Sequence, residues 1–408
     1  MFMAVEIPIY MDNNATTRVD PRVLEQMLPY FTEKFGNAAS RNHSFGWEAE
    51  GAVNNARRQF GALIGADPKE ILWTGGATES NNLAIKGAAH MYAEKGRHII
   101  TSTMEHKAVI DPCKRLAKLG YDVTWLEPDG YGIVYAQQIA EAIRDDTILV
   151  TIMWANNEIG TINEVPEIGK VCREKGVIFH TDATQYVGKM PADVNEAGID
   201  LLSASAHKMY GPKGVGVLYV RRRRPRVRLE PIMEGGGHER GMRSGTLNVP
   251  GIVGMGAAAE ICNNEMANEA IRLAGLSHKL VNGITGQVET AVLNGHPTRR
   301  LPHTANLSFP YVEGESLLMA LKDIALSSGS ACTSASLEPS YILKALGASD
   351  ELAHSSIRFG LGRFNTEEEV DYVVDKVIHA AQHLLMMSPL YDMVLEGVDL
   401  SKVEWAAH

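Results

Sequence analysis

Residues 177–185 read VIFHTDATQ, and residues 201–208 read LLSASAHK. Each segment begins as an apolar run of strand length and ends in residues that carry chemistry. The first run ends at Asp182, and Lys208 follows 26 residues later (208 − 182), just after Ser205 and His207. Ligands of parallel α/β sheets bind at the carboxyl ends of the strands. The two segments therefore predict an α/β fold with a ligand site at one edge of its sheet.

The same residues match the needs of pyridoxal 5′-phosphate (PLP). This cofactor needs a lysine amine for its Schiff base, a carboxylate facing the pyridine nitrogen, and donors for its phosphate. Taken singly, Asp182 could cap a turn, and Lys208 could be an ordinary solvated lysine. The ordered set of acid, hydroxyl, imidazole and lysine favours PLP binding.

Composition excludes several classes of protein. The 408 residues suggest two domains, and 45% hydrophobic with 22% charged residues is typical of a globular protein. No apolar run reaches membrane-spanning length, and the N-terminus lacks signal-peptide features, so we expect a cytoplasmic protein. A net charge of −10 argues against general nucleic-acid binding. The four cysteines are far apart, which predicts neither a metal site nor a disulfide framework.

A basic run at residues 221–228, RRRRPRVR, is the local exception to this acidic balance. A solvated hairpin or sheet edge is the favoured interpretation. Docking of an acidic partner or an RNA is the alternative, which the run is too short to decide.

Apolar strand-length runs alternate with amphipathic stretches up to about residue 250, which predicts a mainly parallel, doubly wound sheet. The predicted strands are Glu70–Thr74, His98–Ser102, Asp122–Leu126, Thr147–Met153, Val177–Thr181, Leu201–Ala204 and Gly216–Val220. The predicted helices between them are Asn81–Lys95, Lys107–Leu119, Ala136–Arg144 and Val165–Lys175. A long helix, roughly Ile252–Val288, then leads to a smaller α+β domain whose first strand is Ala305–Phe309 and whose last helix spans Thr366–Met387.

Two further motifs follow predicted strands. Residues 74–80, TGGATES, form a glycine turn that opens a helix, where backbone N–H groups can bind an anion such as the PLP phosphate. Glycine pairs before helices are common, so this motif alone is a weak signal. His106 could stack on a flat cofactor ring and move protons, although a surface turn is its ordinary alternative.

Two arginine-bearing segments complete the polar motifs. Residues 235–246, GGGHERGMRSGT, form a glycine-rich loop suited to an anion or a subunit contact. Arg358 lies in a strand-like stretch of the second domain, where its guanidinium could bind a carboxylate bidentately or form a surface ion pair.

Cys332 differs from the other cysteines in its surroundings. Cys113, Cys172 and Cys262 lie in helical patterns, as expected of structural cysteines, whereas residues 327–336 read SSGSACTSAS. This small, polar setting predicts a mobile, exposed thiol. Its loop supplies no basic residue, so activation must come from elsewhere in the fold, with His106 as the candidate.

Together these motifs resemble the cysteine desulfurases of the NifS/IscS type, which are class V, fold-type I PLP enzymes. The resemblance runs from IYMDNNATT (residues 9–17) to SKVEW (residues 401–405) and covers essentially the whole chain. Its most specific block, SGSACTSASLEP (residues 328–339), is similar to the long cysteine loop of group I and points to the IscS-like branch.

The resemblance implies a role for each site residue. Lys208, Cys332 and His106 would be catalytic: Lys208 holds PLP as a Schiff base, Cys332 accepts sulfur, and His106 stacks on the ring. Asp182 would face the pyridine nitrogen, and Gln185 the ring hydroxyl. The phosphate would be held by Ala77, Thr78, Ser205, His207 and, from the second subunit of a homodimer, Thr246. The substrate would be bound by Asn14, Asn157 and Arg358.

The resemblance also implies a domain division and partners. A large PLP-binding domain would span residues 16–265, and a small domain would comprise residues 1–15 and 266–408, with a mobile cysteine loop at about 327–340. The partners would be an iron–sulfur scaffold protein and other sulfur acceptors, with transient iron–sulfur cluster contact at Cys332, and neither a membrane nor a resident metal.

The implied reaction converts L-cysteine to L-alanine and leaves a persulfide on Cys332, which supplies iron–sulfur cluster assembly and tRNA thiolation. Two alternatives stay open at this point. One is a selenocysteine lyase or another class V aminotransferase, although an aminotransferase has no use for Cys332. The other is a sulfur-relay docking scaffold with catalysis lost or secondary.

Overall fold

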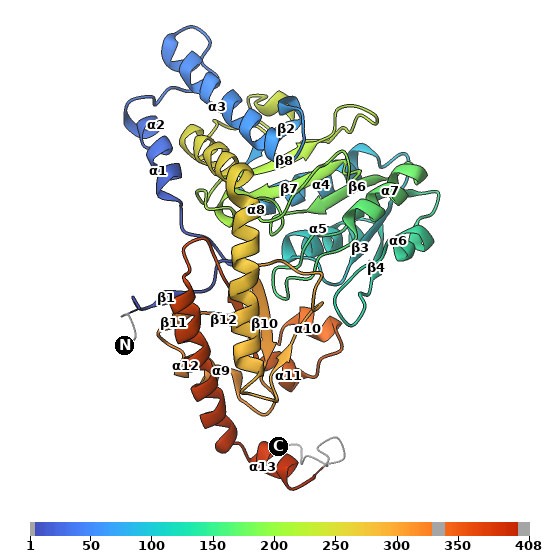
Figure 1. The fold of residues 1–408 in the computed structure, drawn as a ribbon. Coiled ribbons are helices and arrows are strands. Elements are labelled where there is room, and N and C mark those ends of the chain that lie inside the picture. The colour runs from blue at the N-terminus through green and yellow to red at the C-terminus, as the bar shows by residue number, and fades with distance from the viewer. Residues whose placement is uncertain (1–4, 329–338, 399–408) are drawn as a thin grey trace.

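The computed structural model describes residues 5–328 and 339–398. Two bodies, each with its own hydrophobic core, are joined by one long helix, α8 (Val249–Thr285). Figure 1 shows α8 running from the larger body at the top into the smaller body below. Among the described residues, no helix is both long and apolar enough to cross a membrane.

The larger body is built on a seven-stranded sheet of order β2-β8-β7-β6-β5-β3-β4. Its strands are β2 (Ile71–Thr74), β3 (His98–Ser102), β4 (Asp122–Leu126), β5 (Thr147–Thr151), β6 (Ile178–Asp182), β7 (Leu201–Ser205) and β8 (Gly216–Val220). Strands β7, β6, β5, β3 and β4 pair in parallel, while β8 runs antiparallel to β2 and β7. The prediction of a mainly parallel sheet is therefore confirmed.

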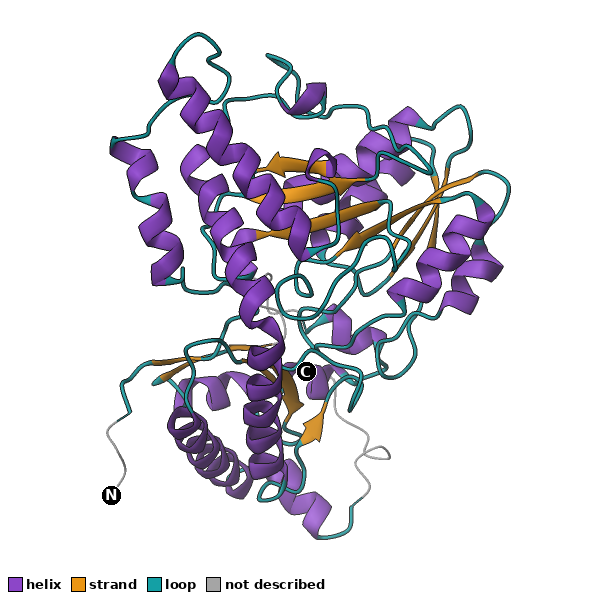
Figure 2. Cartoon of the chain, turned by 45° about the horizontal axis from the view of Figure 1, so that its top comes forward, coloured by secondary structure: helices purple, strands orange, loops and turns teal. Residues whose placement is uncertain are grey.

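Side chains of the strands alternate between two cores, because successive residues of a strand point to opposite faces. On β8, Leu218 and Val220 pack with α4 (Ala77–Met91) and α5 (Lys107–Ala117). Val217 and Tyr219 face the second core, with helices α3 (Ser44–Leu63), α6 (Ala136–Ala142), α7 (Val165–Lys175) and the first half of α8. Figure 2 shows helices on both sides of the sheet, as the doubly wound prediction requires.

The smaller body contains a four-stranded antiparallel sheet of order β12-β13-β10-β9. Its strands are β9 (Val292–Leu293), β10 (Thr304–Ser308), β12 (Ser327–Ser328) and β13 (Ser356–Gly360). Helices α9 (Gly314–Ala320) and α12 (Glu367–Met386) contribute to its core. Near the N-terminus, β1 (Ile9–Tyr10) pairs in parallel with β11 (Ile324–Ala325), so the first strand lies with the C-terminal part of the chain.

Short helices complete the fold. They are α1 (Pro21–Met27), α2 (Pro29–Thr32), α10 (Tyr341–Ala345), α11 (Asp350–His354) and α13 (Pro389–Leu395). Two buried residues of α8 belong to different cores. Cys262 packs in the core of the larger body, and Leu273, further along the same helix, packs in the core of the smaller body. The domain boundary between residues 265 and 266 remains a prediction.

Several predicted boundaries differ from the structure by one to four residues, and two of these differences have identifiable reasons. The helix predicted at Asn81–Lys95 begins at Ala77, because its first turn is polar and faces the cavity described below, which hides it from apolar periodicity. The strand predicted at Thr147–Met153 ends at Thr151, since the Met153 N–H donates to the Glu105 carboxylate (2.9 Å) instead of to a strand. The sequence also predicts Ala305–Phe309 as the first strand of the small domain. In the structure a shorter strand, β9, comes before it and is only two residues long.

The basic run at 221–228 begins inside the fold. Arg221 is buried and pairs with Asp200 (Nε to Oδ1, 3.2 Å), and it donates to the Val194 and Ile199 carbonyls. Arg223 and Arg224 are exposed. One arginine of the run is therefore structural, and the role of the exposed ones remains open.

Glu105 is a fully buried acid between β3 and β5. Its Oε1 accepts from the Ser102 hydroxyl (2.8 Å) and from the Met153 N–H (2.9 Å), while Oε2 has no hydrogen-bond partner within the described ranges 5–328 and 339–398. Burial raises the pKa of Glu105 to about 8. The folded protein therefore holds a proton on this carboxyl that the unfolded chain, with an ordinary pKa near 4.5, releases in the same pH range.

We predict that Glu105→Gln removes a pH dependence of stability. Because the folded pKa is raised, the contribution of Glu105 is fully present below pH about 4.5 and is lost as the pH rises through about 8. Glutamine does not titrate, so the variant should gain on the parent by roughly 1.4 kcal/mol per pH unit within this window. Urea unfolding of parent and variant at pH 5.5, 6.5 and 7.5 measures the difference. Glu25→Gln on exposed α1 is the matched control, and a constant offset for Glu105→Gln would contradict the prediction.

Candidate active site

A cavity of about 990 Å³ opens where the carboxyl ends of the parallel strands meet the smaller body. Of the thirteen site residues predicted from the sequence, eleven line it: Asn14, Ala77, Thr78, His106, Asn157, Asp182, Gln185, Ser205, His207, Lys208 and Arg358. These residues come from segments up to 344 positions apart (358 − 14). The fold therefore brings into one cavity what the sequence distributes over most of its length.

Sheet topology explains this convergence. Asp182 and Ser205 are the last residues of the neighbouring strands β6 and β7, His106 follows β3, and Asn157 follows β5. Carboxyl ends of parallel strands lie at the same edge of a sheet, so their following residues meet there. Arg358 reaches the cavity from β13 of the smaller body.

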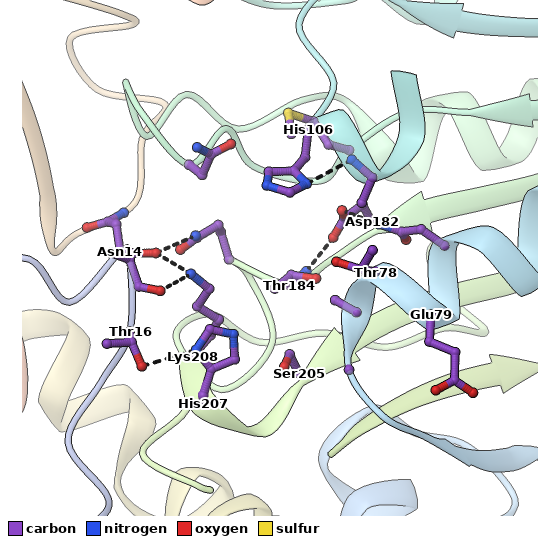
Figure 3. Close-up of a pocket in the computed structure, with 18 of the residues that line it drawn as sticks. Asn14, Thr16, Thr78, Glu79, His106, Asp182, Thr184, Ser205, His207 and Lys208 are labelled. Atoms are coloured by element: carbon purple, nitrogen blue, oxygen red, sulfur yellow. Dashed lines mark hydrogen bonds between the residues drawn. The ribbon is translucent and has the colours of Figure 1, made fainter. Parts of the chain in front are cut away.

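Lys208 ends a short 3-10 turn directly after β7. Its Nζ donates to the backbone carbonyls of Asn14 and Ala15, at 2.6 Å for Ala15. The Gln185 amide also donates to the Asn14 carbonyl (3.0 Å). Figure 3 shows Lys208 directed toward Asn14, with His106 and Asp182 elsewhere around the same pocket. The N-terminal segment therefore holds the amine of Lys208 within the cavity.

Asp182 is buried and well supplied with donors. Its Oδ2 accepts from the Asn81 side-chain amide (2.7 Å), and its Oδ1 accepts from the Thr184 backbone N–H (3.0 Å). Burying a carboxylate is costly unless it is hydrogen-bonded. Two N–H donors orient the group, and each carboxylate oxygen keeps a lone pair for a further donor such as a pyridinium N–H.

The glycine turn is built as a cradle for an anion. Gly76 precedes α4 with φ 155°, in the region that favours glycine, and no side chain caps this helix. A side chain at Gly216 on β8 would meet the backbone of Gly76 at 2.6 Å, so the two backbones approach closely. The first N–H groups of α4 therefore remain available at the cavity, beside Thr78 and Ser205.

His207 lies next to this cradle. Burial lowers its pKa to about 4, assisted by the positive charges of Lys208 and Lys213. Its Nδ1 lies 3.1 Å from the Thr16 hydroxyl. The neutral ring can therefore offer one N–H as a hydrogen-bond donor at neutral pH.

His106 is fixed by the helix that it precedes. Its Nδ1 accepts from the Ala108 backbone N–H (3.1 Å) as the cap of α5. A neutral ring with Nδ1 as acceptor carries its proton on Nε2. His106 is therefore a cavity-lining imidazole of defined orientation.

Arg358, Asn157 and Asn14 form the polar end of the cavity near the smaller body. Arg358 is 2% exposed, and its two terminal nitrogens donate to Asp12 Oδ1 (2.8 Å) and to the Asn157 carbonyl (3.0 Å). Three buried atoms here have no hydrogen-bond partner among the residues that the structure describes: Arg358 Nε, Asn157 Oδ1 and Asn14 Oδ1. Buried polar atoms normally find partners, which indicates a polar ligand group at this end.

The donor set fits PLP and a bound amino acid. Lys208 supplies an amine, Asp182 a carboxylate, and the start of α4 an anion cradle, while Asn81 Oδ1 and Thr184 Oγ1 are further buried atoms without partners near Asp182. No cluster of three or more metal-ligating side chains occurs among the residues that the structure describes.

Two predicted site residues are not placed in the cavity. Cys332 lies outside the described residues. Thr246 is exposed and does not line the cavity of its own chain, so its contribution to a second subunit remains a prediction. Cys113, Cys172 and Cys262 are buried free thiols, and burial raises the pKa of each, as expected of structural cysteines.

Sequence reasoning missed Asn81 and Asp12. Asn81 was assigned to the first turn of a helix that in fact begins four residues earlier, and from Ala77 it lies one turn along the same face. Asp12 stands two residues before Asn14, but only the pairing of Asp12 with Gly360, the last residue of β13, brings it to Arg358. No local pattern in the sequence reveals that contact.

Comparisons with known proteins agree with this geometry. The family model described as aminotransferase class-V matches residues 9–373. The chain is 59% identical to cysteine desulfurase IscS of Anaeromyxobacter dehalogenans (strain 2CP-C), over 98% of this chain and 99% of that protein.

Solved structures give the same result. A NifS-like protein matches with TM-score 0.86 and 39% identity, over 92% of this chain and 100% of that one. A structure of SspA in complex with cysteine matches with TM-score 0.78 and 38% identity, over 88% and 100% of the two chains. The chain therefore belongs to the class-V aminotransferase family and, within it, to the IscS-type cysteine desulfurases.

Proposed function

We propose that this PLP-dependent enzyme converts L-cysteine to L-alanine and transfers the sulfur atom to Cys332 as a persulfide. The observation that carries the proposal is the single cavity in which Lys208, Asp182 and Arg358 meet. An amine, a buried carboxylate and a carboxylate-binding guanidinium are the groups that amino-acid chemistry on PLP requires. Cysteine bound to the structurally similar SspA supports the choice of substrate.

When bound, PLP supplies an electron-accepting ring joined to the substrate amino group. Asp182 holds the proton on the pyridine nitrogen, with its own oxygens oriented by Asn81 and Thr184. Lys208 Nζ, once released, takes the proton from the substrate Cα as general base. The Asn14 and Ala15 carbonyls hold this amine at the cavity.

Arg358 binds the substrate carboxylate and thereby sets the direction of the side chain. Its Nε is the donor left without a partner, and Asn157 and Asn14 lie beside it. Asp12 and the Asn157 carbonyl hold the other guanidinium nitrogens, so the fork is oriented before substrate arrives. The His106 imidazole, with its proton on Nε2, lies at the cavity wall and would stack on the cofactor ring.

Cys332 receives the sulfur. Its thiolate sulfur forms a bond to the substrate sulfur while the substrate Cβ–S bond breaks, and that electron pair stays with carbon. The carbon then takes a proton and becomes the methyl group of alanine, so that cysteine and one enzyme thiol give alanine and one persulfide. A persulfide is a reversible carrier of sulfur.

The resemblance also supports a homodimer in which Thr246 completes the phosphate site of the second subunit. On the same basis, an iron–sulfur scaffold protein and other acceptors take the sulfur for cluster assembly and tRNA thiolation. The first test of the activity is the production of alanine and sulfide from L-cysteine with a reductant. A coloured protein that makes neither product would instead be an aminotransferase or a lyase of another substrate.

We predict that Lys208→Ala loses the covalent cofactor and all desulfurase activity, because no other amine can replace Lys208 as Schiff-base partner and base. Borohydride reduction followed by peptide mass spectrometry should locate the cofactor on Lys208 in the parent. Lys213→Ala, which changes another lysine at the cavity, is the matched control and should keep the covalent cofactor. Cofactor fixed at Lys213 would refute the assignment.

Cys332→Ala should keep the cofactor and its visible absorbance but release no sulfide above background. The reason is that Cys332 alone is proposed to accept sulfur. Cys113→Ala is the matched control. Cys113 is a buried thiol with no proposed part in sulfur transfer, so this variant should retain sulfide release. Turnover at the parent rate by Cys332→Ala would remove Cys332 from the mechanism.

Asn81→Ala should lower kcat about 10- to 100-fold while cofactor still binds. The Asp182 carboxylate would lose one of its two N–H donors, and a hydrogen bond to a charged group is worth about 1.5–3 kcal/mol. Asn82→Ala is the control, because Asn82 also lines the cavity but its amide donates to the Thr78 carbonyl of its own helix rather than to Asp182. Equal kcat values for the two variants would show that Asn81 does not support Asp182.

Arg358→Lys should raise KM for L-cysteine at least about 10-fold with a smaller change in kcat, because an ammonium cannot bind the carboxylate bidentately and still hold Asp12. Steady-state kinetics of sulfide release measures both constants. Arg299→Lys, at an exposed ion pair with Glu164, is the control. An unchanged KM would exclude Arg358 from substrate binding.

A further inference from the structure

Both flanks of the segment that contains Cys332 are attached beside the cavity. On the N-terminal flank, β12 pairs with β13, with Ser327 opposite Arg358 and Ser328 opposite Ile357. The chain therefore enters this segment from the strand that neighbours the substrate-binding arginine.

The C-terminal flank is attached through a buried carboxyl. The Ser340 hydroxyl donates to Glu158 Oε2 at 2.5 Å, and the two residues are 3% and 4% exposed. Glu158 directly follows the cavity residue Asn157, and its own N–H donates to Asn156 Oδ1 (2.8 Å). The side chain of Glu158 does not line the cavity, so the substrate does not explain its burial.

Tyr341, the residue after Ser340, makes a second contact, next to His106. The Tyr341 hydroxyl donates to the Glu105 carbonyl (2.8 Å), and the Lys107 ammonium lies 4.5 Å from the centre of the Tyr341 ring. Glu105 and Lys107 are the neighbours of His106 in the chain. The start of α10 is therefore attached next to both His106 and Asn157.

Apolar packing and capping complete this attachment. Ile342 and Leu343 of α10 form a small buried cluster with Met104 and Ile159. The Ser340 hydroxyl, besides donating to Glu158, accepts the Leu343 N–H (3.3 Å) as the cap of α10. One hydroxyl thus joins the first turn of α10 to the cavity wall.

The hydrogen bond between Ser340 and Glu158 meets the need of a buried carboxyl for a donor. Burial of Glu158 raises its pKa to about 7, so the carboxyl is costly to keep ionised without a donor. Ser340 is the side-chain donor that it receives among the described residues. The pair therefore adds a buried hydrogen bond to the apolar packing that holds residue 340.

Chain geometry connects these anchors to the thiol. Cys332 follows Ser328 by four residues (332 − 328) and precedes Ser340 by eight (340 − 332). An extended chain spans at most about 3.3–3.6 Å per residue, so the limits are about 14 Å and about 29 Å. Ser328 and Ser340, the described residues on either side, are therefore close to Cys332 along the chain.

We propose that Glu158 is a positioning residue for sulfur transfer, which acts by holding Ser340 and with it the C-terminal end of the Cys332 segment at the substrate end of the cavity. The proposal rests on the function proposed above, since it requires Cys332 as sulfur acceptor. It assigns to Glu158 and Ser340 no part in binding cofactor or in removing the Cα proton.

The test separates these steps in the cofactor-loaded enzyme. Stopped-flow visible absorbance after mixing with L-cysteine follows the steps before sulfur transfer, and thiol alkylation with mass spectrometry follows persulfide on Cys332 in a single turnover. For Ser340→Ala we expect absorbance changes within about 2-fold of the parent rate and persulfide formation at least about 10-fold slower. Ser340→Thr, which keeps a hydroxyl, should restore most of the rate.

Ser349→Ala is the matched control. Ser349 caps the nearby helix α11 through Leu352 N–H in the same way, but it is exposed and does not bond Glu158. It should form persulfide within about 2-fold of the parent rate, which separates loss of a helix cap from loss of the Glu158 contact. Glu158→Leu, which removes the acceptor, should reproduce the Ser340→Ala result.

The outcomes are distinct. Persulfide formation at the parent rate in Ser340→Ala and Glu158→Leu would overturn the proposal. So would equal slowing of the absorbance changes and of persulfide formation, or equal slowing in Ser349→Ala, since each indicates a general structural defect. A parent enzyme that forms no persulfide on Cys332 would instead overturn the proposed function.

Discussion

The structure depends on a buried carboxylate at the end of a central strand. Asp182 ends β6, has parallel strands on both sides, and is only 6% exposed. Such a group is tolerated only where donors surround it. The Asn81 amide from α4 and the Thr184 N–H from the following turn meet that requirement, and the position of α4 in turn places the anion cradle. One electrostatic constraint thus links the sheet, the first helix on its face and the cavity.

The smaller body supplies part of the cavity wall. The N-terminal segment passes between the bodies and presents the Asn14 and Ala15 carbonyls to Lys208, while Asp12 pairs with Arg358 from β13. The larger body alone would hold a cofactor-binding set without the guanidinium. The guanidinium proposed to bind the substrate therefore comes from the smaller body, and the lysine and carboxylate proposed to bind the cofactor come from the larger one.

Buried acids of raised pKa lie behind the cavity wall. Burial raises the pKa of Glu105 to about 8 and that of Glu158 to about 7, so both carboxyls are largely or partly protonated near neutral pH. They follow Met104 and Asn157 in segments that leave β3 and β5. Their hydrogen bonds join these segments to Met153 and to Ser340. The Asp182 carboxylate contributes to the raised pKa of Glu105.

The sequence by itself determined the α/β class, most strand positions and eleven of the residues that line the cavity, because residues at strand ends are local signals and the motif block around Cys332 is specific. It misplaced the start of α4, since a polar first turn facing a cavity has no apolar periodicity. Only the tertiary structure decided that Asn81 supports Asp182, that Asp12 holds Arg358 and that Ser340 bonds Glu158. The physical reason is that these pairs join residues 101, 346 and 182 positions apart, whose approach depends on the packing of whole elements.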